Sequence, residues 1–406
     1  MAITRRTFVR TLGIGGAGTV SALLIAARGR EALAGAGLDA EAWLARSQDA
    51  AGAAGRRVIR ISSNENPVGP PRSALEALRA ALGDVPRYPF ATVQALTEAL
   101  ARHHGVGEDH LLLGCGSTEI LRVAVLAFTS PSRPLVTAAP TFEDPGRTAD
   151  ALGVPVISVP VDRQLRLDLE AMADRARGAG LVFLCNPNNP TATLHSGRAV
   201  ADFIARVRRT SPETTVLVDE AYHHYVEDPE YRSAVAIALD QPRVVVSRTF
   251  SKLYGMAGLR LGYAVARPET LEAMRRHRLG LNVNTLVAAA ATAALADEAA
   301  VAAERARNRE AREFTRRALA ELGYPAGPSE ANFIMVDVRR DAREFQKACL
   351  AEGVQIGRPF PPLTTYARIS IGTIEEMKAA VEVFRKVLGT KATAGARPGA
   401  SGRAAG

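Results

Sequence analysis

The residues best suited to chemistry follow the apolar run Val244–Val246, which predicts a buried strand. Lys252 comes shortly after this strand, and an amine there can condense with an aldehyde to form an imine. The hydroxyls of Thr249 and Ser251 and the guanidinium of Arg260 suit a phosphate group nearby. A lysine imine beside a phosphate-binding group indicates pyridoxal phosphate (PLP). Because an isolated lysine is more often a solvated surface residue, the rest of the chain must supply its partners.

A glycine-rich turn offers a second place for a phosphate. Gly116, Ser117 and Thr118 stand in the sequence G-C-G-S-T-E, which follows one predicted strand and opens a helix. Glycines let the backbone approach a ligand, and the amides at a helix N-terminus attract anions. The alternative is that Ser117 only caps the helix.

Two other predicted strands end in polar residues. Asn189 stands in N-P-N-N-P-T, where two prolines stiffen the backbone and hold the amide in one direction. Asp219 closes the run Val216–Val218, and an unpaired carboxylate is costly there if it is buried. A protonated ring nitrogen of a cofactor would offset that cost. Taken alone, Asp219 is better interpreted as a residue that caps a turn.

The elements that must position these residues alternate between strand and helix from residue 111 onward. Such alternation predicts a mostly parallel seven-stranded sheet covered on both faces, with the site at the carboxyl ends of the strands. The predicted strands are Leu111–Leu113, Leu135–Ala138, Val154–Val159, Leu181–Cys185, Val216–Val218, Val244–Val246 and Leu261–Val265. Helices are predicted over 285–322, and a smaller α+β unit follows with strands at Phe333–Val338, Val354–Ile356 and Arg368–Ile371.

These patterns divide the 406 residues into five regions. Residues 35–90 form an N-terminal segment and arm, 91–284 a large cofactor-binding domain, and 285–388 a small C-terminal domain. Residues 1–34 are a targeting segment, and residues 389–406 are a tail rich in Gly, Ala, Pro and Ser that cannot build a core.

Composition and charge exclude two classes of function. Of the net charge of +9, +4 lies in residues 1–34 and +3 after Leu388, which leaves +2 for the body and no footprint for nucleic acid. The cysteines Cys115, Cys185 and Cys349 lack metal-type spacing, and four of the seven histidines form the adjacent pairs His103-His104 and His223-His224, so we expect no metal.

The first 34 residues predict export. The pair Arg5-Arg6 is followed by Thr7, Phe8 and Val9. An apolar glycine-rich stretch comes next, and Ala32–Ala34 offers an A-x-A-like cleavage site. This order is similar to a twin-arginine signal peptide, a route that carries folded proteins. A membrane anchor is the alternative, although the glycines disfavour a stable spanning helix. We therefore expect the twin-arginine translocase as a partner and a periplasmic or otherwise exported location.

The motifs together resemble one family. The order G-x-G-S-x-E, N-P-N-N-P-T, D-E-A-Y and S-K-x-x-G-x-A-G-x-R-x-G-Y is similar to the fold-type I PLP-dependent aminotransferases of classes I and II. The likeness is strongest to the histidinol-phosphate aminotransferase branch, whose N-E-N-P-x-G-P and R-Y-P motifs stand at Asn64–Pro70 and Arg87–Pro89. The resemblance covers residues 58–388.

The resemblance implies a role for each matching residue. Lys252 would carry the imine and move the substrate proton, and Asp219 would pair with the pyridine nitrogen. Asn189 and Tyr222 would hydrogen-bond the ring oxygen. Phe142, where many relatives have Tyr, would stack on the ring.

The phosphate would lie against Arg260, Thr249, Ser251 and the turn over residues 116–118. Tyr88 resembles a tyrosine that reaches this phosphate from a neighbouring subunit, which implies a homodimer with shared active sites.

The substrate would be bound by Arg368, through its acidic group, together with Asn64 and Asn189. Arg358 would act as a second phosphate-binding arginine beside Arg368. Ala192 departs from the family pattern N-P-T-G, and a Cβ at this position restricts the turn.

The expected reaction is the transfer of an amino group between an amino acid, or histidinol phosphate, and a 2-oxo acid. The predicted export favours a free amino acid over a phosphorylated intermediate. A PLP-dependent decarboxylase or lyase is the alternative on the same fold, and a non-catalytic binding protein is a third. The retained Lys252, Asp219 and Arg260 speak against the last of these.

Overall fold

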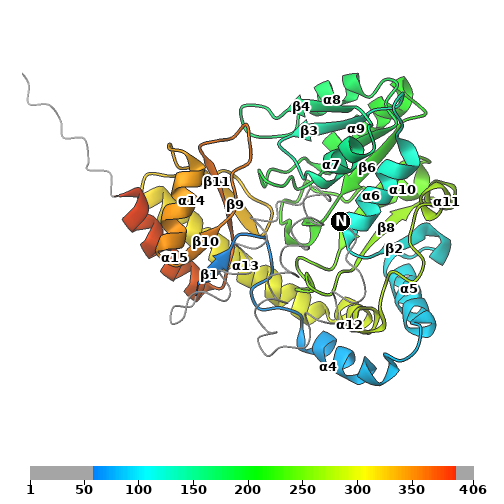
Figure 1. The fold of residues 1–406 in the computed structure, drawn as a ribbon, viewed down its shortest axis with the longest axis horizontal. Helices are drawn as coiled ribbons and strands as arrows, with labels where there is room; N and C mark the ends of the chain where they lie inside the picture. Colours follow the sequence, from blue (N-terminus) through cyan, green and yellow to red (C-terminus); the bar gives the residue numbers. More distant parts are fainter. Residues whose placement is uncertain (1–57, 390–406) are drawn as a thin grey trace, which may run out of the picture. The chain divides into compact units, whose positions relative to one another are not determined.

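The structure, a computed structural model, describes residues 58–389, and a seven-stranded sheet dominates this part of the chain (Figure 1). The predicted signal segment, the segment over residues 35–57 and residues 390–406 of the predicted tail lie outside the described residues. The strands run in the order β2-β8-β7-β6-β5-β3-β4. They are β2 (Leu111–Gly114), β3 (Leu135–Ala139), β4 (Val156–Pro160), β5 (Leu181–Cys185), β6 (Thr215–Asp219), β7 (Val244–Thr249) and β8 (Gly262–Ala266).

The prediction of a mostly parallel sheet is confirmed, and only β8 runs antiparallel to its neighbours β2 and β7. Thr249 at the end of β7 pairs with Gly262 at the start of β8. The chain therefore leaves and re-enters the sheet at one point. Lys252 and Arg260 lie in the loop between these paired ends, at the carboxyl edge of the parallel strands.

Helices cover both faces of this sheet, as the uninterrupted burial of β5, β6 and β7 requires. One face packs against α6 (Ser117–Phe128), α7 (Asp144–Ala151) and α11 (Pro268–Arg275). The opposite face packs against α8 (Leu169–Arg175), α9 (Gly197–Thr210) and α10 (Val235–Asp240). At the β2–β8 end, that second face is covered by α4 (Arg72–Ala80), α5 (Phe90–His104) and α12 (Thr285–Ala296). Short 3-10 helices span Ala81–Asp84, Glu108–His110 and His223–Tyr225.

A smaller α+β part contains two two-stranded sheets around a separate hydrophobic cluster. In one sheet β1 (Ile59–Ile61) runs parallel to β10 (Val354–Ile356), and in the other β9 (Phe333–Asp337) runs antiparallel to β11 (Tyr366–Ser370). Its helices are α14 (Ala342–Ala351), α15 (Ile374–Leu388) and the C-terminal half of α13 (Glu298–Glu321). The fold class predicted from the sequence is thus confirmed for both parts.

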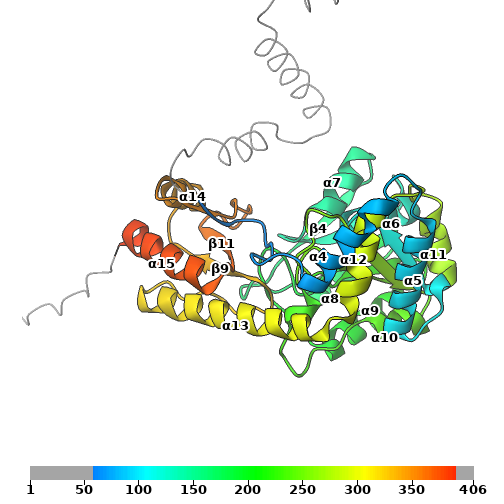
Figure 2. The same cartoon turned by 90° about the horizontal axis from the view of Figure 1, so that it is seen from below.

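Helices α12 and α13 meet at a bend of 82°. Figure 2 shows α13 extending beneath the smaller part, whereas α12 lies beside α4 and α5. Asp297 marks the bend, because its side chain accepts hydrogen bonds from Ala300 N at 3.0 Å and Ser73 Oγ at 2.6 Å. Among the described helices none is by itself long and apolar enough to cross a membrane, and this bent pair meets that test only by length and composition.

The predicted domain boundary at residue 285 stays a prediction. Helix α12 begins there and shares a hydrophobic cluster with the large sheet, while β1 from the predicted arm pairs within the smaller part. Helices α7 and α10 are both short. In α7 the Pro145-Gly146 pair suggests a break, but proline is well accommodated at the first turn of a helix.

Candidate active site

A single cavity at the carboxyl ends of β5, β6 and β7 brings together ten of the residues predicted from the sequence. These ten come from the first turn of α6, four loops and the ends of β6 and β7, and they meet because the parallel strands end at one edge. The ten are Ser117, Thr118, Phe142, Asn189, Asp219, Tyr222, Thr249, Ser251, Lys252 and Arg260.

Lys252 extends into this cavity from the β7–β8 loop. Its Nζ lies 3.4 Å from the carbonyl oxygen of Ser63 and 5.7 Å from the centre of the Tyr222 ring. Burial, with a smaller contribution from nearby Arg368, lowers the pKa of Lys252 to about 8, although Glu65 and Asp219 oppose the shift. The uncharged amine that a nucleophile requires is therefore more populated near neutral pH than in an ordinary lysine.

Asp219, the last residue of β6, is almost fully buried, and its Oδ1 has no hydrogen-bond partner. Burial raises the pKa of Asp219 to about 7; Lys252 lowers this pKa and Glu220 raises it. A buried carboxylate with an unpartnered oxygen suits a cationic partner. The protonated nitrogen of a pyridine ring would satisfy it.

The predicted phosphate site is built by close packing of a turn against Arg260. Gly116 has φ +77°, and a Cβ there would lie 2.2 Å from Arg260 Nη2. A Cβ on Gly262 would lie 2.2 Å from the backbone nitrogen of Ser117. Arg260 itself has φ +64° and is held by a 3.0 Å hydrogen bond from its Nη1 to the carbonyl of Ala257. The start of α6 and a guanidinium thus face the same space, a combination that suits a phosphate.

The two hydroxyls predicted to bind this phosphate, those of Thr249 and Ser251, hydrogen-bond to each other. Thr249 Oγ1 donates to Ser251 Oγ at 2.9 Å and accepts from the Ser251 amide at 3.1 Å. Arg260 Nη1 approaches Ser251 Oγ at 3.4 Å. The β7–β8 loop therefore presents both hydroxyls beside the guanidinium.

Asn189 and Tyr222 each keep a hydrogen-bond donor for the cavity. Asn189 Oδ1 accepts a 2.7 Å bond from Arg368 Nη1, which leaves its Nδ2 as the remaining donor. Tyr222 OH accepts a 3.1 Å bond from Asn64 Nδ2, so its own proton is free to be donated. Burial raises the pKa of Tyr222, which keeps the hydroxyl protonated. Each side chain therefore has a donor left for the ring oxygen that the resemblance implies, and that role stays a prediction.

Arg368 and Asn64 lie at the edge of the same cavity. Arg368 is buried, donates to the carbonyl of Ser62 at 2.7 Å, and has an unpartnered Nε. Burial lowers the pKa of Arg368 to about 10, and neighbouring Tyr222 opposes the shift. Asn64, with φ 55°, is fixed by the hydroxyl of Ser370. The hydroxyl accepts from the Asn64 backbone nitrogen at 2.8 Å and donates to Asn64 Oδ1 at 2.7 Å. A buried guanidinium with a donor to spare suits a carboxylate.

Tyr88 and Arg358 neither line the cavity nor hydrogen-bond to a residue that lines it. Tyr88 is 73% exposed, so within this chain it reaches no cofactor site. Arg358 pairs with Glu143 at 2.6 Å, and its guanidinium lies 4.3 Å from the centre of the Phe360 ring. Ala192, the departure noted in the sequence, has φ +63° and is fully buried, so this chain holds an alanine in the left-handed conformation that glycine prefers.

Sequence reasoning missed five residues that line the cavity, namely Ser63, Glu65, Cys185, Ala221 and Ala257. Four of them are direct neighbours of predicted residues or, like Cys185, end a predicted strand. Glu65 matters most, since its charge raises the pKa of Lys252. Its position directly after Asn64 could have indicated Glu65 as a site residue, but the sequence does not define the path of that loop.

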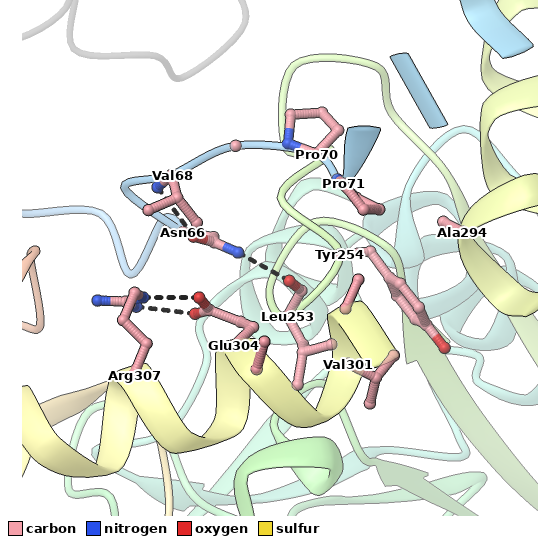
Figure 3. A pocket seen from close by; sticks show the side chains of 13 residues that line it. Asn66, Val68, Pro70, Pro71, Leu253, Tyr254, Ala294, Val301, Glu304 and Arg307 are labelled. Atoms are coloured by element: carbon pink, nitrogen blue, oxygen red, sulfur yellow. Dashed lines mark hydrogen bonds and ion pairs between the residues drawn. The ribbon is translucent and has the colours of Figure 1, made fainter. Parts of the chain in front are cut away.

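A second cavity lies on the far side of the Lys252 loop (Figure 3). The loop contributes Leu253 and Tyr254, and helix α13 contributes Glu304 and Arg307. These two charges satisfy each other, with Arg307 Nε and Nη2 donating to Glu304 at 2.6 and 2.8 Å. The remaining wall is mostly apolar, so we place the chemistry in the first cavity. Within residues 58–389 no group of three or more His, Cys, Asp or Glu side chains is arranged to hold a metal ion.

Comparisons with known proteins agree with this geometry. Residues 56–384 match the family described as aminotransferase class I and II. The chain is 41% identical over 335 residues to a histidinol-phosphate aminotransferase of Symbiobacterium thermophilum, covering 82% of this chain and 91% of that protein. It is 38% identical over 334 residues to an aromatic amino acid aminotransferase of Thermobifida fusca, covering 81% and 90%.

Among solved structures, a histidinol-phosphate aminotransferase from Sinorhizobium meliloti in complex with pyridoxal-5'-phosphate superimposes with a TM-score of 0.76. The two chains are 30% identical, and the match covers 82% of this chain and 92% of the other. The expectation of the fold-type I architecture is thereby confirmed.

Proposed function

The chain belongs to the class I and II aminotransferase family, and from this premise we propose how its residues hold PLP and which substrates they accept. The protein is a PLP-dependent aminotransferase that transfers an amino group between an amino acid, or histidinol phosphate, and a 2-oxo acid. The observation that carries the proposed roles is the buried, unpartnered Oδ1 of Asp219 in one cavity with Lys252. When bound, PLP supplies an aldehyde that condenses with amines and a ring that withdraws electrons from the substrate Cα.

The proposed cofactor contacts follow from the donors and acceptors left free. Asp219 holds the proton on the ring nitrogen, because its Oδ1 is a buried acceptor without another partner. Asn189 Nδ2 and the Tyr222 hydroxyl would donate to the ring oxygen, since their other hydrogen-bonding atoms are engaged by Arg368 and Asn64. Phe142 packs against the ring as part of the cavity wall.

Lys252 is the proposed group that moves the proton at the substrate Cα. Its lowered pKa lets Nζ exist as a free base near neutral pH, which general-base catalysis requires. Arg368 orients the substrate by binding its acidic group, and the surrounding Phe333 and Phe360 rings exclude water from that contact, with the Arg368 guanidinium 5.7 and 4.7 Å from their centres.

We propose a homodimer in which Tyr88 completes the partner's phosphate site. Of the nine exposed large hydrophobic residues in the described part of the chain, eight lie in residues 68–90 and 279–281. They are Val68, Leu75, Leu82, Val85, Tyr88, Phe90, Leu279 and Leu281. Apolar side chains gathered in so few segments favour a protein–protein contact.

We also propose export through the twin-arginine pathway, which rests on the sequence of residues 1–34. An exported enzyme would meet free amino acids rather than a phosphorylated biosynthetic intermediate, so we propose amino acids as its substrates. Replacing Arg5 and Arg6 with lysine should retain the protein in the cytoplasm; unchanged export would refute this route.

A panel of amino acids and 2-oxo acids tests the substrate proposal. We expect amino transfer from several free amino acids, measured as the 2-oxo acid formed. Transfer confined to histidinol phosphate would overturn the proposal, and the absence of transfer from every donor would overturn the enzymatic function itself.

A further inference from the structure

Glu143 and Arg358 form an ion pair beside the substrate arginine. Glu143 directly follows Phe142 of the cavity wall and precedes α7, whereas Arg358 lies between β10 and β11 in the smaller part. Their Oε2 and Nη2 atoms are 2.6 Å apart. Glu143 also accepts from Arg147, one turn along α7, at 2.5 Å. The large sheet's side of the site is thus connected to the smaller part through one carboxylate.

The pair lies close to Arg368 because both arginines stack on the same ring. The Arg358 guanidinium is 4.3 Å from the centre of Phe360, and that of Arg368 is 4.7 Å from it. The charges of Arg358 and Glu143 also influence the pKa of Arg368 in opposite directions. An anionic group bound by Arg368 therefore lies near the Arg358–Glu143 pair.

The ion pair contributes little to folding. The Glu143 and Arg358 side chains are 38% and 41% exposed, and pairs this exposed are weak because water and salt screen them. Nothing else fixes the Glu143 carboxylate except the exposed Arg147. The Glu143 carboxylate adds little stability, but it pairs with Arg358, the arginine beside Arg368. Its main effect is therefore on which anions Arg358 can bind.

We infer that Glu143 is a specificity-determining residue that directs the site toward amino acids with an uncharged side chain. Its carboxylate occupies Arg358 and repels a second anionic group on the substrate, such as a distal carboxylate or phosphate. This inference rests on the proposed function, in which Arg368 binds the substrate's first acidic group. It assigns the selection against a second anion to Glu143 rather than to the size of the cavity.

The test compares substrates that differ only in charge. L-glutamate and L-glutamine are nearly isosteric, so the ratio of their kcat/KM values isolates the effect of the distal carboxylate. We expect Glu143→Gln to raise the glutamate-to-glutamine ratio about three- to tenfold, with a smaller gain at high salt. The gain should appear in KM, and glutarate should become a better competitive inhibitor by a similar factor.

Two further variants separate this effect from others. Asp150→Asn removes the same charge from the exposed end of α7 and should leave the ratio unchanged. Arg358→Gln combined with Glu143→Gln should abolish the gain, because the anion's partner is gone. An unchanged ratio in Glu143→Gln, or an equal gain in Asp150→Asn, would overturn the inference while amino transfer continued. Failure of the proposed function would instead be seen as no transfer in any variant.

Discussion

At the scale of single residues, the site depends on groups that are costly until a cofactor arrives. Asp219 is buried with a free oxygen, and Lys252 is pressed toward its neutral form. Arg260 and Ala192 hold left-handed backbone conformations that side chains disfavour. These features destabilise the cofactor-free protein and are consistent with a site built around a ligand.

Asp219 predicts how the stability of the cofactor-free protein depends on pH. Its pKa in the folded protein, about 7, lies above the ordinary value of 3.8, so the folded state binds the proton more tightly. The stability linked to this proton is complete below the ordinary value and is lost as the pH rises toward 7. The asparagine of Asp219→Asn does not ionise, so this variant does not lose that stability as the pH rises. Thermal unfolding of the two cofactor-free proteins should therefore show the variant gaining on the wild type as the pH rises from about 4 to about 7.

One outcome of this unfolding experiment would contradict the prediction. If the two unfolding temperatures run parallel across that pH range, the Asp219 carboxyl does not titrate as its burial requires. Adding PLP should stabilise the wild type more than Asp219→Asn, because only the carboxylate pairs with a protonated ring nitrogen.

Gly116 predicts a loss of cofactor affinity. The Cβ of Gly116→Ala would meet Arg260 Nη2 and would sit on a backbone with φ +77°, so the guanidinium must move. Losing one charge-assisted contact should weaken PLP binding about 10- to 100-fold, measured by titrating the cofactor-free protein. Gly146→Ala is the matched control, since no atom lies within 4 Å of its Cβ. Equal affinities for both variants would show that the turn does not hold the phosphate.

Much of the candidate site could be predicted from the order of motifs along the chain. Lys252, Asp219, Asn189 and Arg260 all face one cavity, because each follows a strand of a parallel sheet. The partner of Arg358 could not be predicted. Glu143 lies more than two hundred residues away, and only the packing of the smaller part beside α7 brings the two charges together.

At the scale of elements, a buried ion pair joins β6 to β7 behind the site. Glu220 is turned away from the cavity that its neighbour Asp219 faces, and its Oε2 accepts from Arg248 Nη2 at 2.9 Å. Ser233 Oγ and the Ala234 amide also donate to this carboxylate, both at 2.7 Å. Because every oxygen is satisfied, the pair fixes the strand ends that carry Asp219 and Thr249.

Breaking this pair should therefore be costly. Glu220→Ala leaves the Arg248 guanidinium buried without its partner, and we expect a loss of about 3–5 kcal/mol in the free energy of unfolding. Asp174→Asn breaks the largely exposed pair with Arg206 and should cost less than about 1 kcal/mol. Urea unfolding measures both, and a small loss in Glu220→Ala would mean that the strand ends are held by other contacts.

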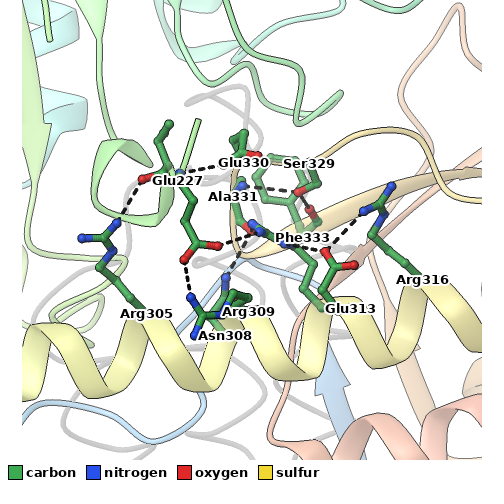
Figure 4. Close-up of polar contacts among 12 residues, drawn as sticks. Glu227, Arg305, Asn308, Arg309, Glu313, Arg316, Ser329, Glu330, Ala331 and Phe333 are labelled. Carbon is green, nitrogen blue, oxygen red and sulfur yellow. Dashed lines mark hydrogen bonds and ion pairs between the residues drawn. The ribbon is translucent and has the colours of Figure 1, made fainter. Parts of the chain in front are cut away.

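Helix α13 shows why pairings between distant elements escape sequence analysis. Glu227, in the loop after β6, accepts from Arg309 at 2.8 Å, while its own amide donates to Glu330 at 2.9 Å (Figure 4). Arg312, buried on α13, donates to the carbonyl of Ala331 at 3.2 Å. Periodicity predicted the helix, yet no spacing rule predicts which loops it joins. The pairing of β1 with β10 escaped prediction for the same reason.

At the scale of the whole molecule, the proposed dimer makes a sharp prediction about shared sites. If Tyr88 acts on the partner's phosphate site, a dimer of one Tyr88→Ala chain and one Lys252→Ala chain contains one fully intact site. Mixing the two variants should therefore restore activity above that of either alone, measured after subunit exchange. Activity that is only the average of the two variants would place Tyr88 outside the partner's site.

The central claim is that PLP is bound covalently by Lys252, and the chain is well suited to testing it. Only five lysines occur in the sequence, and Lys252 is the only one before Lys347. Reduction of the purified, PLP-loaded protein with borohydride, followed by peptide mass spectrometry, should place the reduced cofactor on the peptide that contains Lys252. Cofactor found on one of the other four lysines, or on none, would contradict the account.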